Sequence, residues 1–504
     1  MSDCEVLICG LGPVGQLLAL LLGDLGVRTI AFDEAHEPYD LPRAAVVDDE
    51  VLRIFQAAGV DAAILADAQV MPAVSFVTAR GRTMRVFRTD HGELGHPPLV
   101  TIHQPSMERT MVAALEDRGA VDLRWGERLE VIDRGAEHVT AWIRPVEGGR
   151  AQPLRARYLV GCDGARSSVR ARLQIPFGGS TFAQPWLVVD GLVDRPLAKV
   201  PHPHFVGDTT RPAVTLPMSP GRHRWEWMLR PNERPEPFLE RSRIRELIAP
   251  WLTGERVEIE RAVVYTFHAR TADRWRAGRV LLAGDAAHVT PPFVGQGFSS
   301  GARDVTNLAW KLDAVLRGAP ARLLDSYEAE RRPHVRSMQK FAIRWGGIVQ
   351  TRRPRGGVLR DAVIGTAKRS GALDWLEQRA KPLPTCSAGA FAATPRRLPF
   401  RRAVGSLFPQ PDRLDDRLGR SWAAVSSSAG AARAWRDAGV HAVERPGDPW
   451  LDRHGAEWAL LRPDRFVFAC GGQDELPRAL TALRSTLGPA LSSDRQRASL
   501  AVAA

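Results

Sequence analysis

An alternation of strand, glycines, helix and strand at the start of the chain limits the possible folds more than any other feature. Residues 5–9 are apolar and predict a buried strand, residues 16–25 have helical periodicity, and residues 27–32 predict a second strand. Three glycines after the first strand fit the pattern GxGxxG: Gly10, Gly12 and Gly15. Such glycines permit a tight turn, close approach of the backbone to a pyrophosphate, and close helix-to-strand packing. The chain is therefore predicted to begin with a Rossmann-like βαβ unit that binds a dinucleotide.

Two acidic residues, Asp33 and Glu34, follow the second strand of this unit. A carboxylate at this position can accept hydrogen bonds from both hydroxyls of an adenosine ribose. FAD and NAD both contain that ribose, so this segment alone leaves the two cofactors open.

Two further stretches place an acidic residue directly after a predicted strand. Residues 158–170 (YLVGCDGARSSVR) contain Asp163, and residues 278–297 (GRVLLAGDAAHVTPPFVGQG) contain Asp285. Open α/β sheets bind ligands at the carboxyl ends of their strands. Each stretch on its own is also compatible with a strand, a turn and a helix that serve only packing. Their order along the chain favours the ligand-binding interpretation.

The second stretch ends in glycines that suit a planar ligand. Gly295 and Gly297 lack a Cβ atom and would let backbone N–H groups approach closely. Residues 298–311 predict a helix that begins there, so its positive end would face the ligand.

Composition sets limits on partners and location. The 504 residues, 44% of them hydrophobic, predict two or three domains of roughly 150 residues each. The net charge of +12 comes from scattered arginines, with only five lysines, and this argues against a nucleic-acid partner. Five dispersed cysteines without a CxxC pair argue against disulfides or a zinc site, so no metal is expected. The apolar stretch 17–22 is too short to span a membrane, so we expect a cytoplasmic protein.

Three motifs together resemble the fingerprints of single-component FAD-dependent aromatic hydroxylases, the class A flavoprotein monooxygenases: GLGPVG (10–15), LVGCDGARSSVR (159–170) and GRVLLAGDAAHVTPPFVGQG (278–297). They stand in the order and near the spacings typical of that family. Four segments look like its 3-(3-hydroxyphenyl)propionate hydroxylase branch and related polyketide hydroxylases: PRAAVVDDEVLRIF (42–55), IHQPSMERTM (102–111), YTFHARTADRW (265–275) and SYEAERRPH (326–334).

The resemblance implies a specific chemistry. It implies FAD as cofactor, NADH or NADPH as a transient electron donor, and hydroxylation of an aromatic substrate by dioxygen through a flavin hydroperoxide. The substrate would be phenolic, phenylpropionate-like or a polyketide. Other flavoenzymes on this fold (a halogenase, epoxidase or reductase) and a non-catalytic flavin-binding protein stay open. Trp225 and Trp227 match half of a halogenase WxWxIP motif, but Leu229 and Arg230 replace its Ile-Pro, which favours sheet packing for the tryptophans.

The resemblance also implies which residues bind FAD. Toward the adenosine and pyrophosphate it places Gly10, Gly12, Gly15, Asp33, Glu34 and Asp163. Toward the ribityl chain and the flavin ring it places Arg43, Gln104, Gly284, Asp285, Gly295, Gln296 and Gly297. Among these, Asp285 is expected to bind a ribityl hydroxyl, and the last three residues are expected to offer backbone donors to the pyrimidine edge.

The group that deprotonates the substrate is less defined. Pro292 stands where the family places a backbone carbonyl beside both flavin and substrate. Several side chains are candidates for the base: Asp48, Asp49, His103, Tyr265 and His268. Helix N-terminal charge or packing would equally explain them, and a backbone carbonyl or bound water would also suffice. Arg43 and Arg211 are candidates for binding a substrate carboxylate.

The predicted fold class is α/β with several parts. We expect an FAD-binding domain (1–75, 101–180 and 271–325), an inserted antiparallel substrate-binding sheet (76–100 and 181–270), a helical segment and linker (326–395) and a thioredoxin-like domain (396–504). The last part lacks CxxC, so we expect it to serve packing or subunit contact, which leaves a homodimer open.

Overall fold

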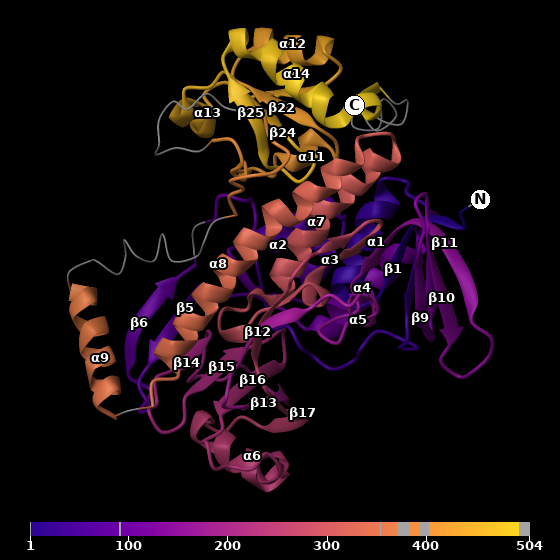
Figure 1. The fold of residues 1–504 in the computed structure, drawn as a ribbon. Coiled ribbons are helices and arrows are strands. Elements are labelled where there is room, and N and C mark those ends of the chain that lie inside the picture. Colours follow the sequence, from indigo (N-terminus) through magenta and orange to yellow (C-terminus); the bar gives the residue numbers. More distant parts are fainter. Residues whose placement is uncertain (1, 90–91, 353, 370–383, 393–402, 493–504) are drawn as a thin grey trace.

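A mostly parallel sheet forms the centre of the protein (Figure 1). The computed structural model describes residues 2–89, 92–352, 354–369, 384–392 and 403–492. The strands of the central sheet lie in the order β19-β20-β11-β1-β2-β8, with β10 on β11 and β9 on β10. Their bounds are β1 Cys4–Cys9, β2 Thr29–Asp33, β8 Val121–Trp125, β9 Glu127–Arg134, β10 Val139–Pro145, β11 Gln152–Gly161, β19 Arg276–Ala277 and β20 Val280–Leu282. β1 runs parallel to both β2 and β11, so the predicted βαβ unit is confirmed.

Helices cover the central sheet because their apolar faces need burial. α1 (Pro13–Asp24) packs against α4 (Gln104–Glu116) and α7 (Gln296–Leu316). The leucines of α1 at positions 17, 18, 20 and 22 are fully buried. Pro13 occupies the first turn of α1, where its missing N–H group removes no helical hydrogen bond.

A second sheet lies beneath the central sheet in Figure 1, on the side away from the C-terminal domain. Its strand order is β17-β13-β16-β15-β14-β5-β6, antiparallel except for the pair β14 and β5. Their bounds are β5 Ala73–Val77, β6 Thr83–Arg88, β13 Trp186–Val193, β14 His204–Val206, β15 Ala213–Pro217, β16 Arg222–Met228 and β17 Val257–Tyr265. Trp225 and Trp227 are buried in the core between this sheet and α6 (Arg241–Ile248), which confirms their predicted packing role.

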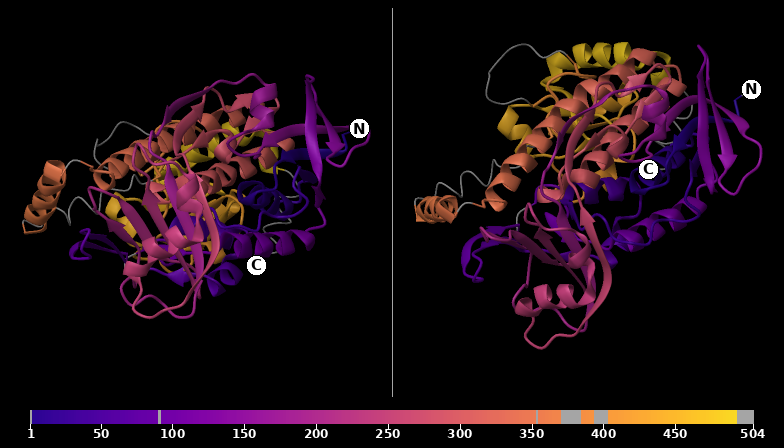
Figure 2. Two further views of the ribbon diagram at one scale, coloured as in Figure 1. Left: turned by 90° about the horizontal axis from the view of Figure 1, so that it is seen from below. Right: turned by 60° about the horizontal axis from the view of Figure 1, so that its bottom comes forward.

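The C-terminal part is a thioredoxin-like α/β unit, as predicted. Its strands lie in the order β23-β22-β24-β25, parallel between β22 and β23 and otherwise antiparallel. The elements are β22 Ala423–Ser426, α12 Ala429–Asp437, β23 His441–Glu444, α13 Pro449–His454, β24 Trp458–Leu461, β25 Val467–Gly471 and α14 Leu476–Leu487. The right-hand view of Figure 2 shows this unit and the second sheet at opposite ends of the molecule.

Aromatic and ionic contacts fasten the C-terminal unit to α7 and to α8 (Asp325–Val349). Trp310 of α7 meets Trp422 edge to face, with the ring centroids 5.6 Å apart. Glu330 of α8 forms buried ion pairs with Lys311 at 3.0 Å and with Arg462 at 2.9 Å. Burial raises the cost of leaving any of these charges unpaired, so the unit is held in one position.

Small elements complete the description. They are β3 Val46–Asp48, α2 Asp49–Ala57, α3 Asp61–Ala66, β4 Gln69–Val70, β7 Leu99–Thr101, α5 Ser168–Arg172, β12 Phe177–Thr181, β18 His268–Ala272, β21 His288–Val289, α9 Pro354–Arg369 and α11 Asp415–Leu418. The domain division stays a prediction; the second sheet begins at Ala73, slightly before the expected residue 76. Much of the predicted linker lies outside the described residues.

Candidate functional site

The turn between β1 and α1 uses its glycines in two ways. Gly10 has φ +105°, and a Cβ atom there would lie 2.6 Å from the carbonyl carbon of Cys162. A Cβ on Gly15 would lie 1.9 Å from the carbonyl oxygen of Gly10. Nothing lies within 4 Å of a Cβ built on Gly12, which lines a cavity. Gly10 and Gly15 are therefore required by the fold, whereas Gly12 leaves room for a ligand.

Asp33 faces this turn from the end of β2. Its carboxylate accepts hydrogen bonds from the backbone N–H groups of Leu11 at 2.7 Å and Ala35 at 2.9 Å. Asp33 and Glu34 both line the cavity. The acidic pair thus lies beside the glycine turn, where the sequence placed it.

Asp163 caps the neighbouring helix while lining the same cavity. Its carboxylate accepts from the backbone N–H of Val169 and the hydroxyl of Ser168, both at 3.0 Å. Arg170 of this helix donates to the carbonyl oxygen of Ala286 at 2.8 Å. The turns after β11 and β20 are therefore linked.

The turn that carries Asp285 is held from beneath by α7. The backbone N–H of Gly284 donates to Asp304 at 3.1 Å, and the same carboxylate binds His288 at 2.6 Å and Arg331 at 2.9 Å. Burial alone would raise the pKa of Asp304, but His288 and Arg331 outweigh it and hold the pKa below its ordinary value. This buried cluster fixes the direction of Asp285.

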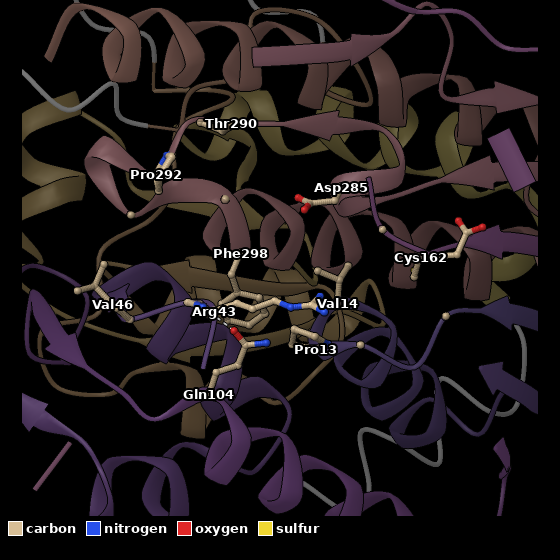
Figure 3. A pocket seen from close by; sticks show the side chains of 18 of the residues that line it. Pro13, Val14, Arg43, Val46, Gln104, Cys162, Asp285, Thr290, Pro292 and Phe298 are labelled. Carbon is tan, nitrogen blue, oxygen red and sulfur yellow. Dashed lines mark hydrogen bonds between the residues drawn. The ribbon is translucent and has the colours of Figure 1, made fainter. Parts of the chain in front are cut away.

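Asp285 itself points into the cavity (Figure 3). Its side chain is exposed to the cavity, and desolvation by the surrounding protein raises the pKa of its carboxyl group. Among the described residues we find no hydrogen-bond or ion-pair partner for it. A carboxyl with free acceptors at this position is suited to bind ligand hydroxyls.

The segment from Pro292 to Gly297 forms the opposite wall. Gly295 has φ +65°, and a Cβ there would lie 2.2 Å from Val46, whereas a Cβ on Gly297 would meet nothing within 4 Å. The N–H of Gly295 donates to the carbonyl oxygen of Pro292 at 2.9 Å. The N–H group of Gly295 already has an acceptor in the protein, so the hydrogen bond to the flavin that we predict for it would have to replace this one. The N–H groups of Gln296 and Gly297 stand in the first turn of α7, where they have no acceptor within the helix.

Gln104, at the start of α4, and Arg43, in the loop before β3, lie across the cavity from Asp285 (Figure 3). Gln104 accepts from the backbone N–H of Ala44 at 2.5 Å and donates to Glu108 at 2.6 Å. Glu108 also accepts from Gln16 of α1 at 3.2 Å, and burial raises the pKa of Glu108 to about 7. This network holds the backbone beside Arg43 close to the glycine turn, and the Arg43 side chain lines the cavity.

Asp48 lies outside the cavity lining. It caps α2 by accepting from the N–H of Val51 at 3.1 Å, and it binds Gln296 at 3.1 Å and Arg303 at 2.7 Å. Arg303 also pairs with Glu50 at 2.5 Å. The structure thus places Asp48 and the Gln296 side chain in a buried hydrogen-bonded cluster between α2 and α7, outside the cavity lining.

The other predicted bases also lie outside the cavity lining. The hydroxyl of Tyr265 accepts from Arg261. His268 bonds Thr181 at 2.9 Å near the surface, and desolvation lowers the pKa of His268. The remaining candidates have protein partners: His103 with Ser106 at 2.9 Å, Asp49 with the N–H of Glu50 at 3.1 Å, and Arg211 with Glu233 at 2.5 Å.

One continuous cavity of about 1380 Å³ joins most of the predicted cofactor residues. It is lined by Gly10, Gly12, Asp33, Glu34, Arg43, Gln104, Asp163, Asp285, Pro292, Gly295 and Gly297. Gly15, Gly284 and Gln296 lie outside the lining, in the helices and the turn that carry the lining residues. The cavity exceeds the roughly 300–1000 Å³ of ordinary small-molecule pockets, so it has room for a dinucleotide and a second ligand.

The second sheet closes the other end of the cavity with residues that the sequence did not single out. Arg224 and Glu226 of β16 line it, together with Val214 and Leu216 of β15. Alternation along β16 is the sequence signal for the direction of these two side chains. Trp225 and Trp227 are buried on one face of the strand, so Arg224 and Glu226, at the alternate positions, face the other.

The described residues contain neither a metal-binding cluster nor a membrane-spanning helix. No group of three or more His, Cys, Asp or Glu side chains in the described ranges is arranged to hold a metal ion. No helix in that part of the chain is long and apolar enough to cross a membrane.

Comparison with known families covers most of the chain. A family model described as FAD binding domain matches residues 3–342, and one described as HcaD C-terminal domain matches residues 439–486. The chain is 32% identical over 532 residues to the 3-(3-hydroxy-phenyl)propionate/3-hydroxycinnamic acid hydroxylase of Escherichia coli O8 (strain IAI1), covering 96% of this chain and 94% of the relative.

Solved structures resemble the whole architecture. Aklavinone-11 hydroxylase in a ternary complex with FAD and aklavinone has a TM-score of 0.80 and 25% identity, covering 97% of this chain and 99% of the neighbour. The p-nitrophenol 4-monooxygenase of Pseudomonas putida DLL-E4 has a TM-score of 0.67 and 27% identity, covering 76% and 100%. The first neighbour therefore shares the fold of nearly the whole chain, and the second that of about three quarters of it.

Proposed function

The chain belongs to the family of FAD-dependent aromatic hydroxylases, and from this premise we propose that its own substrate is a phenol of phenylpropionate or polyketide type. The named substrate of the sequence relative is a hydroxyphenylpropionate, and the neighbours act on aklavinone and p-nitrophenol. NADH or NADPH would supply electrons in a transient visit, since the sequence contains no second GxGxxG pattern.

The continuous cavity is the observation that carries this proposal. Its glycine-lined part runs from Asp33 and Gly12 to Asp285 and Gly297, and its far end lies under the second sheet. Within the described residues, the unfilled space at Gly12 and Gly297 and the unpartnered carboxyl of Asp285 fit a long ligand with a pyrophosphate, hydroxyls and a flat ring. FAD has these parts in this order.

Each region then has a task. Gly12 and the N-terminus of α1 would hold the pyrophosphate, Asp33 the ribose, and Asp285 a ribityl hydroxyl. The first turn of α7 would direct N–H groups at the edge of the flavin. When bound, FAD supplies electron transfer to dioxygen and an electrophilic oxygen atom.

The remaining space suits the substrate. Aromatic side chains from three parts of the fold line it: Phe205, Phe293, Phe341 and Trp345. Such a wall binds an aromatic ring and excludes water, which protects a reactive intermediate from side reactions.

The test is oxygen incorporation by the purified holoenzyme. NADH or NADPH oxidation should rise when a phenol is added, and labelled dioxygen should place one oxygen atom in the product. We would use 3-(3-hydroxyphenyl)propionate first, then larger polycyclic phenols. Stimulated oxidation that yields only hydrogen peroxide with every phenol would contradict the proposal. Halide-dependent chlorination or bromination would indicate the halogenase alternative instead.

Assembly and location stay predictions from the sequence. A homodimer would be tested by the molar mass in light scattering, and a cytoplasmic location by fractionation of the producing cells.

A further inference from the structure

Glu226 is an acidic side chain in an apolar wall of the cavity. It lies in the middle of β16, with Val188 of β13 and Val214 of β15 as its neighbours across the sheet. Because Trp225 and Trp227 fill the core behind the sheet, Glu226 projects to the cavity side. Its side chain is 16% exposed.

The nearest cation is already engaged by other groups. Arg224 lies 4.0 Å from Glu226, but it donates to both oxygens of Asp190 at 2.6 and 3.1 Å. It also donates to the backbone carbonyl oxygens of Arg43 at 2.8 Å and Pro42 at 3.1 Å. With its side chain only 4% exposed, Arg224 cannot turn toward a substrate. In the described part of the chain we find no hydrogen-bond partner for Glu226.

The surroundings bring the titration of Glu226 into the neutral range, where its ionised form can accept a proton. Burial raises the pKa of Glu226 to about 7, with Arg224 opposing and Asp190 adding to the shift. Of the charged groups near it, Arg224 and Asp190 act on the pKa of Glu226. Other titratable residues on the same strands are Arg222, His223, Glu258, Glu260, Arg261 and Tyr265, and the cavity lining adds Arg43, Arg88 and Asp285, among others. β15 presents only uncharged residues, Val214, Thr215 and Leu216.

Resting on the function proposed above, we propose that Glu226 accepts the proton of the substrate's phenolic hydroxyl. The phenol O–H bond breaks and a carboxyl O–H bond forms, so the electron pair stays on the phenol oxygen and spreads into the ring. The ring carbon ortho or para to that oxygen then takes the oxygen atom. When the ring regains aromaticity, its C–H proton leaves to solvent and Glu226 returns its proton to the original oxygen.

This assignment also orients the substrate. A carboxylate on the substrate would be repelled at Glu226, since Arg224 is engaged. The hydroxyl end of the ring would therefore lie against β16, and any acidic group would point away from this strand.

Glu226→Gln is the central variant, because it keeps size and hydrogen bonding but cannot take a proton. For the wild-type holoenzyme, kcat/KM with 3-(3-hydroxyphenyl)propionate should rise with pH through about 7, as Glu226 ionises. In Glu226→Gln this rise should vanish, and the rate at pH 8 should fall at least about tenfold. Glu258→Gln, on an exposed position of β17, is the matched control and should keep the wild-type profile.

Equilibrium binding to the oxidised enzyme gives a second readout. An ionised Glu226 should bind the phenol more tightly at pH 8 than at pH 6, whereas the methyl ether of the same compound, which has no proton to donate, should gain no affinity at pH 8. In Glu226→Gln the phenol should lose this pH dependence.

Three results separate the possibilities. An unchanged pH profile in Glu226→Gln would overturn the inference and leave the proposed function standing. Failure of the wild type to hydroxylate any phenol would overturn both. If Glu226→Gln lost FAD or stability, Glu226→Asp should still show the rise with pH; a flat profile in a folded, FAD-loaded Glu226→Asp would also overturn the inference.

Discussion

The two ends of the cavity are built differently: backbone conformation shapes one end, and side chains shape the other. We call the glycine-lined end the floor. Its shape depends on backbone, because Gly10, Gly15 and Gly295 permit conformations or contacts that a Cβ atom would block. We call the end that the second sheet closes the roof. Its shape depends on side chains at alternate positions of β15 and β16, such as Leu216 and Glu226. A change in the floor therefore disturbs the fold and the cofactor, whereas a change in the roof should disturb the substrate alone.

The largest effect is expected for Gly15→Ala in the floor. The new Cβ would lie 1.9 Å from the carbonyl oxygen of Gly10, so the β1–α1 turn must open. We expect a loss of at least about 3 kcal/mol in the free energy of unfolding and little FAD in the purified protein. Denaturant unfolding and flavin absorbance measure both. Gly119→Ala, with nothing within 4 Å and no positive φ, should behave as wild type.

Gly12→Ala separates the cofactor from the fold. Gly12 has φ −69° and ψ 178°, which alanine adopts freely, and a Cβ there meets no protein atom within 4 Å. The variant should keep its stability but bind FAD at least tenfold more weakly, about 1.4 kcal/mol, by fluorescence titration of the apoprotein. Unchanged FAD affinity would show that the pyrophosphate does not lie against Gly12.

Asp285→Ala should weaken FAD binding without a comparable effect on chemistry. Removal of a charged acceptor for a ribityl hydroxyl should lower affinity by about tenfold. At saturating FAD, the turnover per bound flavin should stay near that of the wild type. A turnover that stays low when every site carries FAD would instead assign Asp285 to the reaction.

The smallest effect is expected for Trp345→Ala, on the aromatic wall that α8 adds beside the roof. Trp345 of α8 lines the cavity and meets Phe87 and Phe205 edge to face, with centroids 5.7 and 5.5 Å away. Loss of this aromatic surface should raise KM for the phenol about fivefold, near 1 kcal/mol. FAD affinity should not change, and a matching loss of FAD would remove the distinction between floor and roof.

The floor was predictable because glycine reports backbone conformation directly. GxGxxG, the acid after β2 and the acid after β20 all follow from strand ends and turns, which are local. The structure places Asp33 and Asp285 in one cavity, as the sequence led us to expect.

The residue that deprotonates the substrate could not be chosen from local patterns, because the partners of a charged side chain often come from distant parts of the chain. Asp48 looked available at a helix start, but Arg303, far along the chain, binds it. The sequence around Glu226 gives no sign of its position in the cavity, because the two flanking tryptophans indicate only the apolar face of β16. Strand alternation would have found its direction, but only the assembled sheets reveal what it faces.

The central sheet also constrains how the protein is made. β11 lies between β1 and β20, yet β20 begins only at Val280, after the entire second sheet has been synthesised. Pairings between such distant segments form slowly, because a long loop must close before they stabilise the chain. During translation β11 can join β1 early, but its other edge must wait unpaired, and the turn that carries Asp285 must stay absent, until residues 280–285 leave the ribosome. Fragments that stop before β20 should emerge without the cofactor and depend on chaperones to stay soluble.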